Sequence, residues 1–136
     1  MKSTVFDSYA VLAYLFDEQG APVVMEHLRK ALEEKEKVFI SSVNWAEVGY
    51  QCIRRCGIAE WKAIQARLLE FPIEVVETDL LQTGLAAEFK AEHKMSLADA
   101  YAAALAVQKK AELLTGDPEF KAVESRLKKI IWLNKG

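Results

Sequence analysis

Short apolar runs with the character of β-strands alternate along the chain with longer segments that have the period of α-helices. The runs are brief and rich in β-branched, aliphatic and aromatic residues, which predicts strands. Five such strands are expected, with the sequences STVFD, VFIS, IEVV, LLT and IIWL, at residues 3–7, 38–41, 73–76, 113–115 and 130–133.

The segments between these runs predict helices, whose ends carry recognisable signals. The signals are glycine and proline breaks and serine or threonine N-caps. Helices are expected from Ser8 to the break at Gly20, from Pro22 into the charged run EEKEK, over 43–56 between a Ser41 or Ser42 cap and Gly57, over 59–71 before Pro72, after a Thr78 cap, and from Ser96 through Ala106. This alternation predicts an α/β fold whose parallel sheet is covered by helices on both faces.

The length and composition are those of one compact domain. The chain has 136 residues, of which 51% are hydrophobic and 28% charged, so we expect a single domain over 1–136. No apolar run approaches the length of a membrane span, and no basic region followed by a long apolar stretch opens the chain. We therefore expect a cytoplasmic protein without a membrane partner. Cys52 and Cys56 are one helical turn apart, which suits a disulfide poorly, and we expect both to be reduced.

Four acidic residues occupy places where an α/β fold positions its chemistry. Asp7 and Asp117 each follow a predicted strand, while Glu47 and Asp99 lie in the opening turns of helices that begin at the same edge of the sheet. Because ligands bind at the carboxyl ends of the strands in such sheets, all four can converge. Each also has a plainer interpretation. Asp7 and Asp117 can be helix N-caps, Asp99 can complete a capping box with Ser96, and Glu47 can form a buried salt bridge.

The agreement in placement of the four acids and the repulsion between them favour a metal site over the plainer interpretations. Glu47 shares a helix face with Val43, Ala46 and Tyr50, which we interpret as the inward side. Unit charges ~4 to 5 Å apart repel by roughly 3 to 4 kcal/mol per pair at an effective dielectric near 20. Such a cluster must hold protons or a hard cation, so Mg²⁺ or Mn²⁺ is the expected cofactor.

The net charge of −2 argues against a general nucleic-acid coat, since such domains usually have a strongly basic face. If a metal neutralises the four acids, however, the remaining surface is slightly basic. Basic pairs that can then line a path for a nucleic acid are Arg54 and Arg55, Lys109 and Lys110, and Lys128 and Lys129.

The chain resembles PIN-domain ribonucleases, in particular the VapC-like toxins of type II toxin–antitoxin systems, over nearly its full length. The matching segments are VFDSYAVLAYL around Asp7, ISSVNWAEV around Glu47, MSLADAYAAALA around Asp99 and LLTGDPEF around Asp117, in the order and spacing of the family. The resemblance implies a PIN-like three-layer α/β/α sandwich with a parallel five-stranded sheet in the order 3-2-1-4-5. The switch point of that sheet would lie between the strands that end at Asp7 and Thr115.

The resemblance also implies an activity, which is metal-dependent hydrolysis of RNA phosphodiester bonds by an endoribonuclease. Asp7 and Asp99 would be the main metal ligands, and Glu47 and Asp117 would complete the catalytic cluster. The implied partners are an RNA substrate, a cognate antitoxin protein and a second copy of the chain in a homodimer.

Four further residues are candidates for supporting roles around the acids. Ser8 and Thr115 match small hydroxyl positions of the family pattern and can orient a carboxylate or a water, or can simply be a cap and a strand end. Asn44 can contact the site or merely follow a cap. Glu119 departs from the pattern, because many relatives carry Asp there, and adds a further acid that is set differently.

Other enzymes that share this architecture fit less well. A haloacid-dehalogenase-type phosphatase would carry a second acid two residues after Asp7, a response-regulator receiver would carry an acid after the third strand with a lysine near the last, and a nucleotide-binding enzyme would carry a glycine-rich loop. The main alternative is a catalytically weak or inactive PIN-fold protein-interaction module. In that case Tyr14, Phe16 and Val24 on the first helices would form a docking groove, unless they belong to the core.

Overall fold

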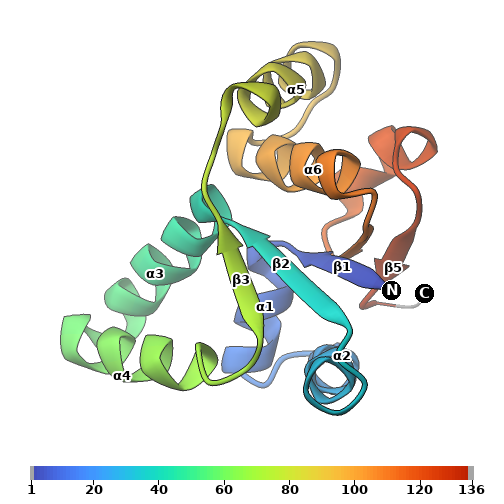
Figure 1. Ribbon diagram of the computed structural model, residues 1–136. Coiled ribbons are helices and arrows are strands. Elements are labelled where there is room, and N and C mark those ends of the chain that lie inside the picture. The colour runs from blue at the N-terminus through green and yellow to red at the C-terminus, as the bar shows by residue number, and fades with distance from the viewer. Residues whose placement is uncertain (1, 135–136) are drawn as a thin grey trace.

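Five short parallel strands form one sheet in the computed structural model of the protein, which describes residues 2–134 (Figure 1). The order across the sheet is β3-β2-β1-β4-β5, as the resemblance to the family implied. The strands are β1 (Ser3–Phe6), β2 (Lys37–Ser41), β3 (Ile73–Val76), β4 (Glu112–Thr115) and β5 (Ile130–Trp132). The parallel pairing of β1 with both β2 and β4 places β1 at the centre.

Helices cover both faces of the sheet and make the fold a three-layer α/β/α sandwich (Figure 1). One face carries α1 (Ser8–Leu15), α2 (Ala21–Glu33), α3 (Ser42–Cys56) and α4 (Ile58–Leu68). The other face carries α5 (Leu80–Glu92), α6 (Leu97–Lys109) and the 3₁₀ helix η1 (Pro118–Arg126).

The two cores follow from the alternation of side chains along the strands. Val5 and Leu113 contribute to the core under α5 and α6, while their neighbours Phe6 and Leu114 contribute to the core under α1 to α4. All four are at most 1% exposed, so β1 and β4 are buried on both faces. This explains why their sequences are continuous apolar runs and not alternating ones.

The alanine-rich helix α6 packs closely against the middle of the sheet. Five of its residues between Ala100 and Ala106 are alanines that are at most 2% exposed, and it contacts β1, β2 and β4. Small side chains allow this helix to approach the strands, and the approach brings its first turn to the carboxyl ends of β1 and β4.

Several helix ends differ from the predicted ones. Asp79, and not Thr78, caps α5, since its Oδ1 accepts a hydrogen bond from Gln82 N at 2.8 Å. The fourth helix ends at Leu68. Ser41 caps α3, and Gly57 has the expected positive φ, 88°. With a ψ of 164° it is not in the left-handed helical region; it ends α3 and also begins α4, which leaves no room for a longer connection.

Cys52 is buried and Cys56 exposed, and both are free thiols, as expected. Between Lys2 and Asn134, no helix combines the length and the apolar character that crossing a membrane requires.

Candidate metal centre

The predicted acids lie at the carboxyl edge of the sheet, where β1 and β4 are neighbours. From β1 the chain turns into α1 and continues to β2, on one side, and from β4 it continues through η1 to β5, on the other. Asp7 follows β1 directly and Thr115 ends β4. The two connections leave in opposite directions, and the divergence opens a crevice of the kind that binds ligands in α/β folds.

Asp7 is both the N-cap of α1 and the most deeply buried acid of the site. Its Oδ1 accepts a hydrogen bond from Ala10 N at 2.8 Å, and its Oδ2 accepts one from Thr115 Oγ1 at 2.5 Å. The side chain is almost entirely enclosed, with Asp7 only 1% exposed. Burial raises the pKa of Asp7 to about 7, against the two hydrogen bonds that lower it, and the charges of Asp117 and Glu47 raise it further. The two interpretations of Asp7, cap or site, are therefore compatible.

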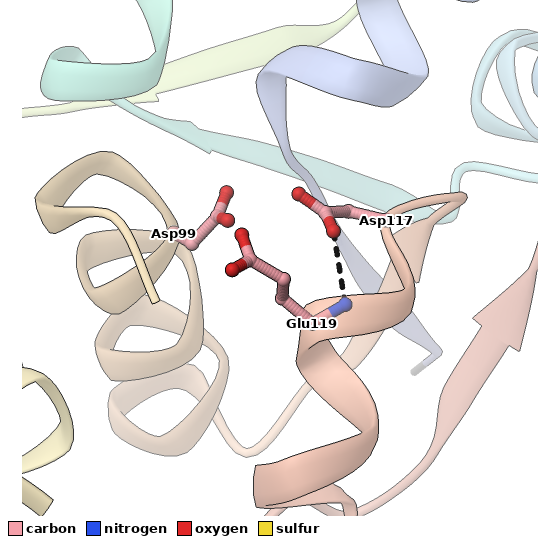
Figure 2. Close-up of side chains that lie close together, drawn as sticks. All are labelled: Asp99, Asp117 and Glu119. Carbon is pink, nitrogen blue, oxygen red and sulfur yellow. Dashed lines mark hydrogen bonds between the residues drawn. The ribbon is translucent and has the colours of Figure 1, made fainter. Parts of the chain in front are cut away.

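Asp99, Asp117 and Glu119 bring their carboxylates together, as Figure 2 shows. One oxygen of each lies within 4.8 Å of the others. Asp99 comes from the first turn of α6, while Asp117 and Glu119 come from the start of η1 (Figure 2). The cluster therefore joins two segments that belong to different connections of the sheet.

Asp99 is the most strongly perturbed of these acids. Burial raises its pKa to about 8, and the charge of Asp117, a hydrogen bond with the Asp117 carboxyl, and the charges of Asp7 and Glu47 add to the effect. Half of the predicted capping box is present, because Asp99 N donates to Ser96 Oγ at 3.0 Å. Within residues 2–134 no hydrogen bond runs back from Ser96 N–H to the Asp99 carboxylate, so that carboxylate faces the cluster.

Asp117 combines a cap and a site position in the same way as Asp7. Its Oδ1 accepts from Glu119 N at 2.9 Å, and its own N–H donates to Thr115 Oγ1 at 3.0 Å. Thr115 thus receives one bond from Asp117 and gives one to Asp7. This hydroxyl, fully buried, fixes the relative position of the two acids.

Glu47 lies beside this group and not within it. Ser8 Oγ donates a hydrogen bond to Glu47 Oε1, and the charge of Glu47 raises the pKa of both Asp7 and Asp99. The structure thus brings Asp99, Asp117 and Glu119 into one cluster, with Asp7 and Glu47 coupled to it by charge. No salt bridge to Glu47 occurs in the described part of the chain, which leaves the salt-bridge interpretation without support.

The predicted inward face of α3 was wrong. Ala46 and Tyr50 are exposed and Glu47 is half-buried, whereas the buried side contains Val48 and Gly49. The reason is the packing of α4. Gly49 has no side chain, and a Cβ built there would lie 3.2 Å from the Trp61 ring. The glycine therefore lets the Trp61 ring of α4 pack against α3, and the side of α3 that contains Gly49 is the buried one. Glu47 is left at the border, where it faces the crevice.

Asn44 connects three elements beneath the acids. It is completely buried, and its Nδ2 donates to Ser8 Oγ at 3.0 Å and to Ala98 O at 3.2 Å. The bonds tie α3 to the starts of α1 and α6. Ser8, buried as well, passes the connection on to Glu47.

A cleft of about 430 Å³ opens over the cluster. Glu47, Asp99, Asp117 and Glu119 line it, whereas Asp7 is too deeply enclosed to do so. The wall also includes Tyr9 and Gln51, which the sequence had not suggested for the site, and Arg55, one of the basic residues that were expected to line a path for a nucleic acid. A signal was available for Gln51, since Glu47, Gln51 and Arg55 follow one another at the i, i+4, i+8 spacing of a single helix face.

The donor set fits a hard divalent cation. All five acids offer carboxylate oxygens, and none of them forms a salt bridge with a basic side chain from Lys2 to Asn134. The raised pKa values of Asp7 and Asp99 mean that the cluster carries protons near neutral pH unless a cation compensates the charge. Oxygen-only ligands of this kind are those that Mg²⁺ and Mn²⁺ prefer.

A separate, apolar groove of about 700 Å³ lies between α1, α2 and α4, away from the acids. Tyr14, Met25 and Phe71 are among the side chains that line it. Of the residues predicted for a docking groove, Tyr14 lies there, Phe16 lines the acidic cleft instead, and Val24 is 1% exposed and belongs to the core. Val24 faces the sheet because it shares the buried stripe of α2 with Leu28.

The PIN domain family matches residues 4–125. No curated protein matches the sequence. A chain of VapBC2 from Rickettsia felis, solved with a fragment of promoter DNA, has a TM-score of 0.75 at 17% identity, over 95% of this chain and 97% of that one.

Two further solved structures show the same fold. VapC20 of Mycobacterium tuberculosis, a toxin that cleaves the sarcin–ricin loop, has a TM-score of 0.68 at 21% identity, over 88% of this chain and 94% of that one. PAE2754 of Pyrobaculum aerophilum has a TM-score of 0.64 at 20% identity, over 97% of this chain and 90% of that one.

Proposed function

Because this chain belongs to the PIN domain family, we propose that it is a metal-dependent endoribonuclease that hydrolyses RNA phosphodiester bonds. Members of the family are generally metal-dependent nucleases. The observation that carries the proposal is the group of carboxylates at the switch point of the sheet, with no basic partner among the described residues and with the pKa values of Asp7 and Asp99 raised. Buried carboxylates without basic partners destabilise the fold, and a protein that served only as an interaction module would gain nothing from them.

Asp7 and Asp99 are the proposed principal metal ligands, with Glu47 and Asp117 completing the set and Glu119 close enough to join it. A bound Mg²⁺ or Mn²⁺ would lower the pKa of a water nucleophile and offset the charge that develops on the phosphate. Thr115 holds the Asp7 carboxylate in place by donating to Oδ2. Ser8, itself held by Asn44, does the same for Glu47. Because these orienting groups are buried, the carboxylates are preorganised before substrate binds.

We further propose that the protein is the toxin of a toxin–antitoxin pair. The similar solved structures include VapBC complexes and a toxin that cleaves the sarcin–ricin loop. The apolar groove between α1, α2 and α4 supports a protein partner, because Tyr14 and Met25 leave apolar surface in contact with water there. A cognate antitoxin is the partner proposed for it, and a homodimer is the proposed assembly.

The experiment that tests the nuclease assignment is incubation of total RNA with the purified, antitoxin-free protein in Mg²⁺, in Mn²⁺ and in EDTA. Wild type is expected to cut RNA with either ion and to leave it intact in EDTA, while Asp7→Asn cuts at a small fraction of the wild-type rate. Asp79→Asn is the matched control, because Asp79 is also an N-cap aspartate but lies outside the cleft. The assignment fails if wild type cuts no RNA, or if Asp7→Asn cuts as fast as Asp79→Asn.

A further inference from the structure

The cleft over the acids extends along two helices. Tyr9 and Leu12 of α1 and Phe16, the C-cap of that helix, line one wall at the i, i+3, i+7 spacing of a helix face. The other wall is lined by Glu47, Gln51 and Arg55 of α3. Both helices begin at the carboxyl edge of the sheet, so both stripes lead away from the acids. The separation of Glu47 and Arg55 corresponds to about 12 Å along the helix axis at a rise of ~1.5 Å per residue.

Arg55 is the one basic side chain that lines this cleft within the part of the chain that the structure describes. Its guanidinium carbon lies 4.1 Å from the centroid of the Phe16 ring, and Phe16 lines the cleft as well. The ring therefore holds the guanidinium on the wall of the cleft. Arg55 forms no salt bridge with any acid of residues 2–134, Glu18 of the same cleft included.

A guanidinium in this position retains its binding capacity. Stacking on an aromatic face uses the plane of the group and leaves the N–H donors at its edge available. Those donors match the geometry of a phosphate, to which arginine often binds through two parallel hydrogen bonds. The side-chain amide of Gln51, one turn closer to the acids, adds a second donor on the same wall.

We propose that Arg55, assisted by Gln51, forms a subsite for a backbone phosphate of single-stranded RNA that neighbours the phosphate to be cleaved. This inference rests on the proposed function. It follows from the charge along the cleft, since a polyanion that enters an acidic crevice needs a cation where its next phosphates lie. The strand would run along α1 and α3, with the scissile phosphate at the acids and another phosphate at Arg55.

Arg54 provides a matched control. It precedes Arg55 on the same helix end, is exposed, and places its guanidinium over an aromatic ring, that of Tyr50, at 4.8 Å. It does not line the cleft. Arg54→Gln and Arg55→Gln therefore remove the same charge, the same interaction with the C-terminal end of α3 and the same kind of ring contact. Only Arg55→Gln removes a guanidinium from the cleft. Arg55→Lys retains the positive charge there but lacks the two parallel N–H donors of the guanidinium.

The test is fluorescence anisotropy of a labelled, randomised 20-nucleotide RNA with protein that carries Asp7→Asn to prevent cleavage, over a series of salt concentrations. In that background Arg55→Gln is expected to weaken binding about 5- to 10-fold and to lower the slope of log affinity against log salt by about 0.7, as for the loss of one phosphate contact to a single strand. Arg54→Gln is expected to change binding by less than about 2-fold, and Arg55→Lys to lie between. Equal thermal midpoints of the two Gln variants would exclude misfolding.

Cleavage kinetics separate this inference from the proposed function. In the otherwise wild-type enzyme, Arg55→Gln should raise KM by about the same factor as it weakens binding while kcat changes little. The subsite is disproved if Arg55→Gln binds RNA as tightly as its parent, if Arg54→Gln loses as much affinity, or if the parent binds no RNA. If the binding contrast appears but no variant cleaves RNA with Mg²⁺ or Mn²⁺, the phosphate subsite stands and the nuclease assignment falls.

Discussion

Without metal, the difference in stability between Asp7→Asn and wild type should shift in favour of the variant as the pH rises. The carboxyl of Asp7 is 1% exposed, and its pKa is raised from an ordinary value of 3.8 to about 7, mainly by burial. An acid whose pKa is higher in the folded than in the unfolded state contributes stability while it is protonated. That contribution is complete below about pH 4 and is lost as the pH rises through about 7.

The size of the effect follows from linkage. The difference between the two pKa values amounts to roughly 4 kcal/mol at ~1.4 kcal/mol per pKa unit, which is an upper estimate for the whole range. Between pH 5 and pH 8 this contribution to the unfolding free energy of wild type falls by roughly 2 to 3 kcal/mol. Asn carries no charge at either pH and keeps an oxygen for the hydrogen bond from Ala10 N. It cannot accept the bond from Thr115 through its NH₂ group, which costs about 1 kcal/mol at both pH values.

The measurement is urea unfolding of wild type and Asp7→Asn in EDTA at pH 5 and pH 8. The difference in unfolding free energy should move in favour of Asp7→Asn by about 2 to 3 kcal/mol between the two pH values. Asp79→Asn is the control. Hydrogen bonds from Gln82 N and, to a smaller extent, from the Gln108 side chain lower the pKa of Asp79. This acid is therefore ionised in the folded and the unfolded protein from pH 5 to pH 8, and Asp79→Asn should change the unfolding free energy equally at both pH values. If the difference in unfolding free energy between Asp7→Asn and wild type is equal at pH 5 and pH 8, the claim that ionisation of this buried carboxyl destabilises the folded protein is refuted.

Three further predictions concern the same crevice. Mg²⁺ affinity, measured by titration calorimetry, should rise steeply from pH 6 to pH 8.5, because the pKa values of Asp7 and Asp99 are about 7 and 8 and both acids must lose protons to bind; a flat profile would contradict this. Thr115→Val removes the donor that lowers the pKa of Asp7 and should move that profile to higher pH, whereas an unmoved profile would deny the hydroxyl its role. Gly116→Ala places a Cβ against the Tyr9 ring and should lower RNA cleavage at least several-fold; a fully active variant would show that the ring moves aside without effect.

The strands and the approximate helices could be predicted from the sequence because β1 and β4 are buried on both faces and read as continuous apolar runs. The order of the strands could not, since nothing in the local pattern states which strands are neighbours, and it came from the resemblance to a family. Asp7 and Asp117 were predictable because each directly follows a strand. Their roles as caps or site residues could not be separated, and the structure shows that both serve as caps within the site.

Errors arose where packing between elements decides which way a side chain faces. The inward side of α3 depends on Gly49, which admits Trp61 from the next helix, and a helical wheel of α3 alone contains no trace of that contact. Glu119 is a separate case, because it was expected to be a further acid near the site that is set differently from the family pattern. One of its carboxylate oxygens lies within 4.8 Å of oxygens of Asp99 and Asp117, and its N–H donates to Asp117 Oδ1 at the start of η1.

The central claim is that carboxylates at the switch point of the sheet hold a divalent cation with which the protein cleaves RNA. The most direct measurement is the single-turnover rate of cleavage of an end-labelled RNA at pH 8, in EDTA and after Mg²⁺ is restored, for wild type, Asp99→Asn and Asp79→Asn. We predict that restored Mg²⁺ returns the full rate to wild type and to Asp79→Asn, while Asp99→Asn is slower by about 100-fold or more. Cleavage that persists in EDTA, or an Asp99→Asn rate within a few-fold of wild type, would contradict the claim.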